Sequence, residues 1–152
     1  MLVYLLRHAI AQDRAASDSA RDLTVEGLAQ ARSLTEKFKQ YSPAMDRVLG
    51  SPYNRAQQTA SAVMTLFADL ALTTDESIKP GGDVYGVLDA IEGIDVQHLL
   101  IVSHNPFLSN LLSVMVDGTM ESHRYVDNAV LHCVSMDVVA SGCGEIAYTL
   151  EP

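Results

Sequence analysis

The sequence is poor in cysteine and has no long apolar run, and both shortages exclude classes of protein. Only two cysteines occur in 152 residues, Cys133 and Cys143, and their spacing fits neither a zinc knuckle nor a disulfide scaffold. Apolar stretches stay well below the roughly 18 residues that a membrane-spanning helix needs. Residues 1–6 lack the basic flank and long apolar core of a signal peptide. We therefore expect a soluble, cytoplasmic protein whose cysteines have no redox or metal-binding role.

Positive charge is also scarce. Ten Lys and Arg stand against 19 Asp and Glu, which gives a formal net charge of −9 at pH 7. A chain of this sign is repelled by nucleic acids and anionic lipids, so we expect no nucleic-acid partner and no membrane partner. The hydrophobic content of 48% in 152 residues suits one compact domain, residues 1–152, with a substantial core.

Predicted strands and helices alternate along the chain, without a low-complexity linker or an internal repeat. Short apolar runs rich in strand-forming residues predict buried strands at 2–6, 47–49 and 99–102. The stretch 72–78 is expected to be irregular or a short strand, and 129–136 with 145–150 an antiparallel hairpin near a sheet edge. The alternation predicts an α/β fold, a three-layer α/β/α sandwich with a mostly parallel central sheet.

Four helices are expected, each with a recognisable start. The starts are Thr24, Ser51-Pro52, Asp83 and Asn105-Pro106, which combine N-capping side chains with prolines suited to a first turn. The first helix has apolar or small residues at helical spacing, namely Leu28, Ala31, Thr35 and Phe38, and is expected to end at Ser42-Pro43.

Basic and imidazole side chains follow three of the predicted strands. Arg7 and His8 come directly after the first, His104 follows the strand at 99–102, and Arg55 lies in the first turn of the helix after the second. Because parallel strands present their carboxyl ends at one edge of a sheet, we expect the four side chains to converge. Two guanidinium groups, two imidazoles and two helix N-termini together favour a tetrahedral oxyanion such as phosphate.

Other interpretations of the same residues remain open. An arginine and a histidine at a strand end can be solvated surface groups, but convergence of several such groups favours a site. Arg21, in the loop before the first helix, is a candidate third guanidinium at the rim. A surface ion pair with Asp18 or Asp22 is its structural alternative.

Four ordered motifs resemble those of the histidine phosphatase superfamily, also called the phosphoglycerate-mutase-like clan. The matching segments are Leu6-Arg7-His8-Ala9, Leu23-Thr24-Val25-Glu26-Gly27, Ser51-Pro52-Tyr53-Asn54-Arg55 with Thr59-Ala60, and Ser103-His104-Asn105-Pro106. The short length and the run from Ser17 to Thr24 are most similar to the SixA-type phosphohistidine phosphatases. Two positions depart from the family pattern, since Ala9 and Ser103 each replace a commoner glycine.

The resemblance implies a mechanism. In that scheme His8 is the nucleophile, which attacks phosphorus in line and becomes a phosphohistidine until water hydrolyses it. Arg7, Arg55 and His104 would hold the phosphoryl oxygens and offset the charge that builds in the transition state. The scheme requires no metal and no cofactor.

The general acid is less clearly marked. Asp83 is the candidate, with its alternative role as a helix N-cap, and Glu76, Asp18 and Asp22 are weaker candidates. A sugar alkoxide needs a positioned acid when it leaves, whereas the imidazole of a phosphohistidine accepts a proton readily. A site without a strong acid therefore favours phosphoramidate substrates. The absence of an evident insertion after Arg55 agrees, since an open site can admit a residue on a protein surface.

Three functions are consistent with the sequence. The first is a phosphatase that acts on phosphohistidine in a protein partner, such as a histidine phosphotransfer domain or another phosphocarrier. The second is a small-molecule phosphatase that acts on phosphomonoesters. The third is a catalytically idle module that binds phosphate and recognises phosphorylated partners. Mutase activity fits poorly, because holding a phosphoryl group for transfer back requires a closed site that excludes water.

Overall fold

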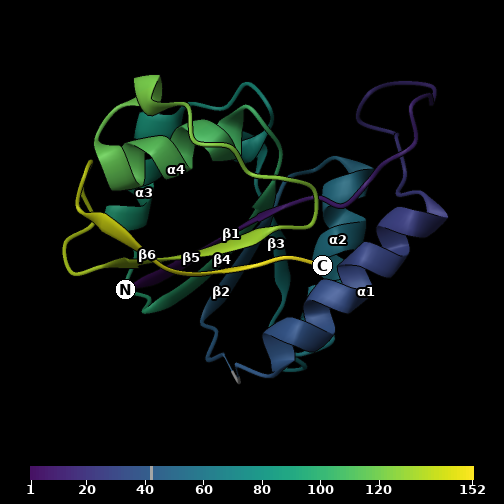
Figure 1. Ribbon diagram of the computed structural model, residues 1–152, viewed down its shortest axis with the longest axis horizontal. Helices are drawn as coiled ribbons and strands as arrows, with labels where there is room; N and C mark the ends of the chain where they lie inside the picture. The colour runs from purple at the N-terminus through teal and green to yellow at the C-terminus, as the bar shows by residue number, and fades with distance from the viewer. Residues whose placement is uncertain (42) are drawn as a thin grey trace.

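The fold is built around a six-stranded sheet (Figure 1) in a computed structural model that describes residues 1–41 and 43–152. The strands are β1 (Leu2–Arg7), β2 (Arg47–Gly50), β3 (Leu72–Thr74), β4 (His98–Ser103), β5 (Leu131–Met136) and β6 (Gly144–Leu150). Their order across the sheet is β3-β2-β4-β1-β5-β6. The four strands β3, β2, β4 and β1 are parallel, whereas β5 pairs antiparallel with both β1 and β6. The mostly parallel sheet and the edge hairpin are thus both confirmed.

Helices cover both faces of this sheet. Helices α1 (Val25–Lys39) and α2 (Asn54–Met64) pack on one face, and α3 (Val84–Glu92) and α4 (Phe107–Asp117) on the other (Figure 1). Short 3-10 turns, η1 (Glu76–Ile78) and η2 (Met120–Ser122), lie in the loops after β3 and α4. Within the described residues, no helix is both long and apolar enough to cross a membrane. The three-layer sandwich is confirmed.

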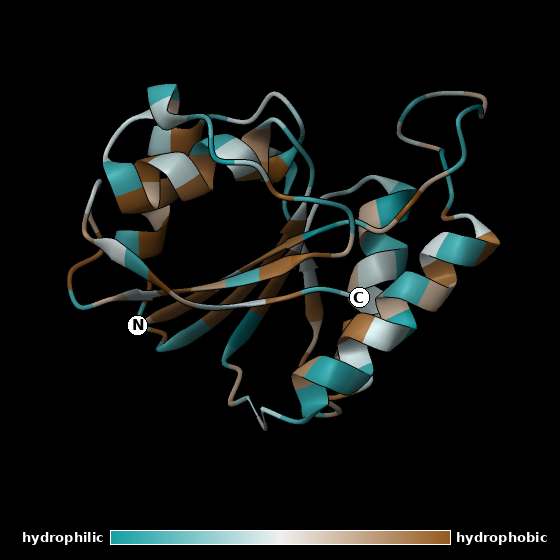
Figure 2. Ribbon diagram, in the orientation of Figure 1, coloured by the Kyte–Doolittle hydropathy of each residue, from teal (hydrophilic) through white to brown (hydrophobic). Residues whose placement is uncertain are grey.

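Alternating side chains of the central strands divide the core into two. Val3 and Leu5 of β1 point into the cluster beneath α3 and α4, while Tyr4 and Leu6 point into the cluster beneath α1 and α2. Side chains on both faces of β1 are buried because a parallel sheet covered on two sides excludes water from both. Figure 2 shows the apolar residues on the strands and on the inner sides of the helices. Each fully buried aliphatic side chain contributes about 1.5–3 kcal/mol to this core.

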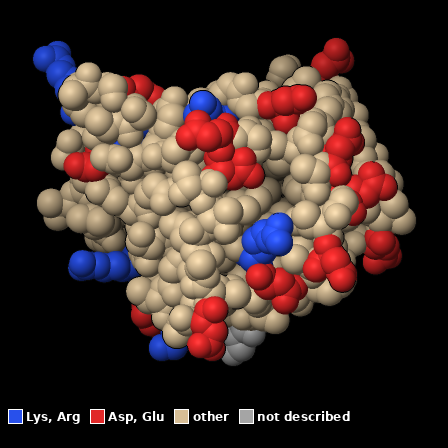
Figure 3. All heavy atoms as spheres, turned by 180° about the vertical axis from the view of Figure 1, so that it is seen from behind, with Lys and Arg blue, Asp and Glu red and all other residues tan. Residues whose placement is uncertain are grey.

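The outer surface matches the charge of the chain. On the face seen in Figure 3, acidic side chains are spread over much of the area, and basic side chains lie apart from one another among them. The arginines of the carboxyl edge are therefore exceptions in an acidic protein with a net charge of −9.

Helix starts follow the expectations in part. Thr24 caps α1 by accepting a hydrogen bond from the Gly27 N–H at 2.9 Å, as expected. Leu28, however, is 41% exposed, and Leu34 takes its place on the buried face. The expected stop at Ser42 lies outside the described residues, and α1 ends at Lys39.

The starts of α2 and α4 lie further along the chain than predicted. Helix α2 begins at Asn54 and α4 at Phe107, so Ser51 and Asn105 do not act as N-caps. Both side chains have other partners: Ser51 Oγ bonds the imidazole of His104, and the Asn105 amide donates to the Val126 carbonyl. The prediction was wrong because these polar groups serve tertiary contacts instead of the helix ends.

Strand register brings three chain segments together at the carboxyl edge. Arg7 of β1 lies opposite Ser103 of β4, and the His8 N–H donates to the Ser103 carbonyl at 3.0 Å. On the other side of β4, the Ser51 N–H donates to the Val102 carbonyl at 3.0 Å. The residues that follow β1, β2 and β4 are therefore neighbours in space.

The turn from residue 10 to helix α1 depends on a glycine. A Cβ on Gly27 would lie 2.0 Å from the Ile10 carbonyl oxygen, a backbone atom that also accepts from Thr24. We expect Gly27→Ala to lower the free energy of unfolding by about 1–3 kcal/mol, the cost of overpacking. Gly81→Ala is the matched control, because a Cβ there meets nothing within 4 Å. Urea denaturation measures both, and equal stabilities would contradict the assigned contact.

Candidate active site

His8 lies at the end of β1 with its two ring nitrogens in different roles. Nδ1 is 2.7 Å from the Ala9 carbonyl oxygen, which can only accept, so Nδ1 carries the proton and donates. Nε2 then holds a lone pair, which accepts a hydrogen bond from Arg55 Nε at 3.2 Å. Burial is the main cause that lowers the pKa of His8 to about 4, and the charges of Arg55 and Arg7 lower it further. The imidazole is neutral at pH 7, as a nucleophile must be.

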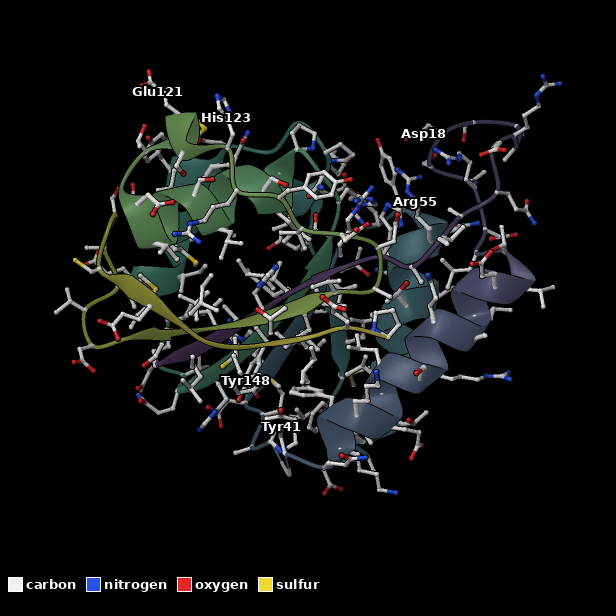
Figure 4. The ribbon with its side chains drawn as sticks, in the orientation of Figure 1. Asp18, Tyr41, Arg55, Glu121, His123 and Tyr148 are labelled. Atoms are coloured by element: carbon white, nitrogen blue, oxygen red, sulfur yellow. The ribbon has the colours of Figure 1, made fainter. Side chains whose placement is uncertain are left out.

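Arg55, in the first turn of α2, is buried except for 4% of its surface. In addition to the hydrogen bond from its Nε to His8, its terminal nitrogens donate to Asp18. Nη1 donates to the Asp18 carbonyl oxygen at 2.6 Å, and Nη2 donates to the carboxylate at 3.1 Å. Figure 4 shows Asp18 in the loop before α1 beside Arg55. The second Asp18 oxygen pairs with Arg21 at 3.0 Å, so the structure gives Arg21 the ion pair that was its structural alternative. Both arginines lower the pKa of Asp18, Arg21 foremost.

His104 follows β4 and lies with its ring 5.0 Å from the ring of His8. Its Nε2 bonds Ser51 Oγ at 2.7 Å, while Tyr53 packs against the ring at 5.0 Å between centroids. Burial is the first cause that lowers the pKa of His104 to about 3, followed by the neighbouring His8 and Arg55. This second imidazole is also neutral at pH 7.

Arg7 is held from the opposite side by the segment before β5. Its Nη1 donates to the Tyr125 hydroxyl and to the Val126 carbonyl, both at 3.0 Å. The guanidinium carbon also lies 5.6 Å from the centre of the Tyr125 ring. These contacts fix one end of the guanidinium group and leave the other for a ligand.

Unpaired buried polar atoms are concentrated at this site. Five are found among the described residues, and two of them are Arg7 Nε and His104 Nδ1. A third, Asn105 Oδ1, comes from the residue after His104. A buried polar group without a partner costs about 1–3 kcal/mol. One of these nitrogens belongs to the residue before His8 and the other to a ring 5.0 Å from the His8 ring, which indicates a place where an oxyanion supplies the acceptors.

The candidate general acids lie in different surroundings. Asp22 accepts hydrogen bonds from the side-chain amides of Asn54 and Gln58, and Glu76 pairs with Lys79 at 2.9 Å. The arginines beside Asp18 lower the pKa of its carboxyl group.

Asp83 is the N-cap residue of α3, but its side chain makes no capping hydrogen bond and lies against Gly86. With Tyr53 it lines a hollow of about 360 Å³. Asp83 is therefore exposed, near the site, and not committed to a helix end.

Three contacts of the site were not predicted from the sequence. Ser51 was interpreted only as a helix cap, although the short Ser-Pro motif did mark the segment. Tyr125 and Val126 lie in an irregular segment without any motif, so no sequence signal pointed to them. Among residues 1–41 and 43–152, no cluster of three or more His, Cys, Asp or Glu is arranged as a metal site.

Both site histidines are expected to stay neutral well below the ordinary histidine pKa of 6.5. Their values of about 4 and about 3 mean that the unfolded chain takes up protons near pH 6.5 while the folded chain does not. The free energy of unfolding should therefore fall as the pH drops from 6.5 towards 4. NMR titration of ¹⁵N-labelled histidines checks the cause directly, and a midpoint above pH 6 for His8 or His104 would contradict it.

Comparisons with known proteins agree with the geometry. The family model of the histidine phosphatase superfamily (branch 1) matches residues 3–79. The chain is 37% identical over 125 residues to the phosphohistidine phosphatase SixA homolog of Haemophilus influenzae, over 74% of this chain and 76% of that protein. It is 30% identical over 158 aligned positions to phosphohistidine phosphatase SixA of Escherichia coli, and the alignment covers 100% of this chain and 94% of that protein.

A solved structure extends the likeness to three dimensions. The protein histidine phosphatase SixA, complexed with tungstate, superposes with a TM-score of 0.88 at 29% identity, over 100% of this chain and 97% of that one. The putative phosphohistidine phosphatase SixA from Agrobacterium tumefaciens has the same fold, with a TM-score of 0.84 at 22% identity. The motifs at the strand ends, the sheet topology and these relatives lead to one conclusion, that this chain belongs to the histidine phosphatase superfamily.

Proposed function

We propose that the chain is a phosphohistidine phosphatase, that it acts on a phosphorylated protein, and that His8 is its nucleophile. The observation that carries the proposal is the state of His8: a neutral ring whose Nδ1 proton is bound to the Ala9 carbonyl and whose Nε2 lone pair faces Arg55. The names of the SixA relatives support the substrate class. We also propose that residues 1–152 work as one catalytic domain.

The proposed reaction has two displacement steps. The His8 Nε2 lone pair gives up its hydrogen bond from Arg55 Nε and attacks phosphorus. The P–N bond to the substrate imidazole breaks, and the departing nitrogen takes a proton from solvent or from a nearby acid. His8 keeps its Nδ1 proton on the Ala9 carbonyl, so the phosphorylated ring carries a positive charge, which makes His8 a good leaving group in the second step. Water then attacks phosphorus, and the P–N bond to His8 breaks to release phosphate. Arg7, Arg55 and His104 would hold the phosphoryl oxygens in both steps.

An accessible mouth supports a protein substrate. Tyr125, which holds Arg7, is 66% exposed, and the hollow beside it has a volume of about 440 Å³. A phosphohistidine presented on a protein surface can approach such a site without removal of a cover. A histidine phosphotransfer domain or another phosphocarrier is the kind of partner we propose.

The alternative is hydrolysis of small phosphomonoesters. It would need an acid on the leaving side, and Asp83 is the candidate with a free carboxylate. A binding module without catalysis is the third possibility, and it is disfavoured because a nucleophile with a prepared lone pair is unnecessary for binding alone.

Replacement of His8 should abolish turnover. We expect His8→Ala to reduce release of phosphate from a phosphohistidine protein by at least about 10⁴-fold, because the covalent route disappears. His98 supplies the matched control, since it lies at the start of β4, at the opposite end of that strand from His104, and His98→Ala removes an imidazole away from the site. Radiolabelled phosphoprotein measures both. Unchanged turnover in His8→Ala would refute the mechanism, and rapid hydrolysis of sugar phosphates with none of phosphohistidine would favour the alternative substrate class.

Loss of the Asp83 carboxylate should affect substrates unequally. We expect Asp83→Asn to change phosphohistidine hydrolysis by less than about threefold, because imidazole leaves without a strong acid. Any turnover of an alkyl phosphomonoester should fall by at least about tenfold. Steady-state kcat/KM for both substrates checks the difference. An equal loss on both would show that Asp83 has a role unrelated to the leaving group.

A further inference from the structure

The contact between Ser51 and His104 is not explained by the folding of either segment. Ser51 is completely buried, and its Oγ lies 2.7 Å from His104 Nε2. The backbone of Ser51 is satisfied separately, since its N–H donates to Val102 and its carbonyl accepts from Gln57. The hydroxyl group is therefore free to serve the imidazole alone.

Two hydrogen-bond directions are compatible with this distance. If His104 Nε2 carried the proton and donated to Ser51, the serine hydrogen would need a second acceptor, and the hydrogen bonds of the described residues include none for it. His104 Nδ1 would then turn a lone pair towards a site built for an anion. If Ser51 donates instead, the serine hydrogen is paired and the proton of the neutral ring must lie on Nδ1.

The unpaired state of His104 Nδ1 decides between the two. This atom is buried and has no hydrogen-bond partner among the residues that the structure describes, and its ring lies 5.0 Å from the nucleophilic ring of His8. Phosphoryl oxygens accept hydrogen bonds and do not donate them when ionised. Only an N–H at this position stabilises them, whereas a lone pair repels them.

We infer that Ser51 is a positioning residue whose hydroxyl donates to His104 Nε2, fixes the Nδ1–H tautomer, and thereby makes a neutral histidine an obligatory donor to the phosphoryl group. The inference deepens the proposed function and rests on it for the identity of the ligand. The low pKa of His104 fits it, because a ring that stays neutral has only one N–H to place. Ser51 itself does not touch the phosphoryl group in this arrangement.

A second buried serine at the same edge provides a matched control. Ser103 precedes His104 and is also completely buried, but its hydroxyl donates to the carbonyl of Ile78. Replacement of either serine by alanine removes one buried hydroxyl group and leaves a similar cavity. Only Ser51→Ala removes a hydrogen bond from the imidazole.

The first test reads the tautomer directly. In ¹⁵N-labelled protein at pH 7, the His104 shifts should show a proton on Nδ1 in the unmodified chain and in Ser103→Ala. Ser51→Ala should give a mixture of the two tautomers, and Ser51→Thr, which keeps a hydroxyl, should restore the single one. A proton on Nε2 in the unmodified chain would overturn the inference, and this measurement depends on neither a variant nor a substrate.

The second test measures affinity for tungstate, a tetrahedral oxyanion, by calorimetry. Ser51→Ala should weaken binding about tenfold, the effect of about 1.4 kcal/mol. In a His104→Ala background the same change should have less than a twofold effect, because a residue that acts through His104 has nothing left to position. Equal losses in both backgrounds would overturn the inference. This test measures binding and not turnover, so its result remains valid even if the protein does not hydrolyse phosphohistidine.

Discussion

The parallel pairing of β4 with β1 and β2 is the constraint on which the site depends. It sets Arg7 opposite Ser103 and brings Ser51 to Val102, so three loops leave the sheet at one edge. Because these strands are buried on both faces, a slip of register by one residue would turn each side chain into the opposite layer of the core, disrupt its packing and move the site residues apart. The energy that holds the two histidines 5.0 Å apart therefore comes from the core, not from contacts between them.

The positive charge at this edge of the sheet belongs to the arginines, because the histidines are neutral. Arg7 and Arg55 supply the positive charge, whereas burial keeps both imidazoles neutral. The two rings place their protons alike but use opposite atoms: His8 presents a lone pair, and His104 is proposed to present an N–H. The two arginines attract an anion, and His8 stays unprotonated and able to attack. Such preorganised dipoles cost no rearrangement when charge develops on the phosphoryl oxygens.

The sequence predicted the architecture and the four converging residues because both follow from strong local signals. Apolar runs marked the strands, and the polar residues directly after them had to lie at one sheet edge. Ser51 and Asn105 were misjudged as helix caps because capping propensity is local, whereas their partners, His104 and Val126, are distant in the chain. The support of Arg7 by Tyr125 was beyond prediction for the same reason. Tertiary hydrogen bonds of irregular segments have no periodicity to reveal them.

Asp18 competes with a bound anion for the guanidinium group of Arg55. Its carbonyl and carboxylate occupy the terminal nitrogens of Arg55 in the free protein. An anion that takes the same N–H groups replaces Asp18 as their acceptor, so its affinity is a difference between two sets of charged hydrogen bonds instead of the full strength of one. The same carboxylate can return as the anion departs. For those N–H groups, a loop of the protein is a tethered competitor of the ligand.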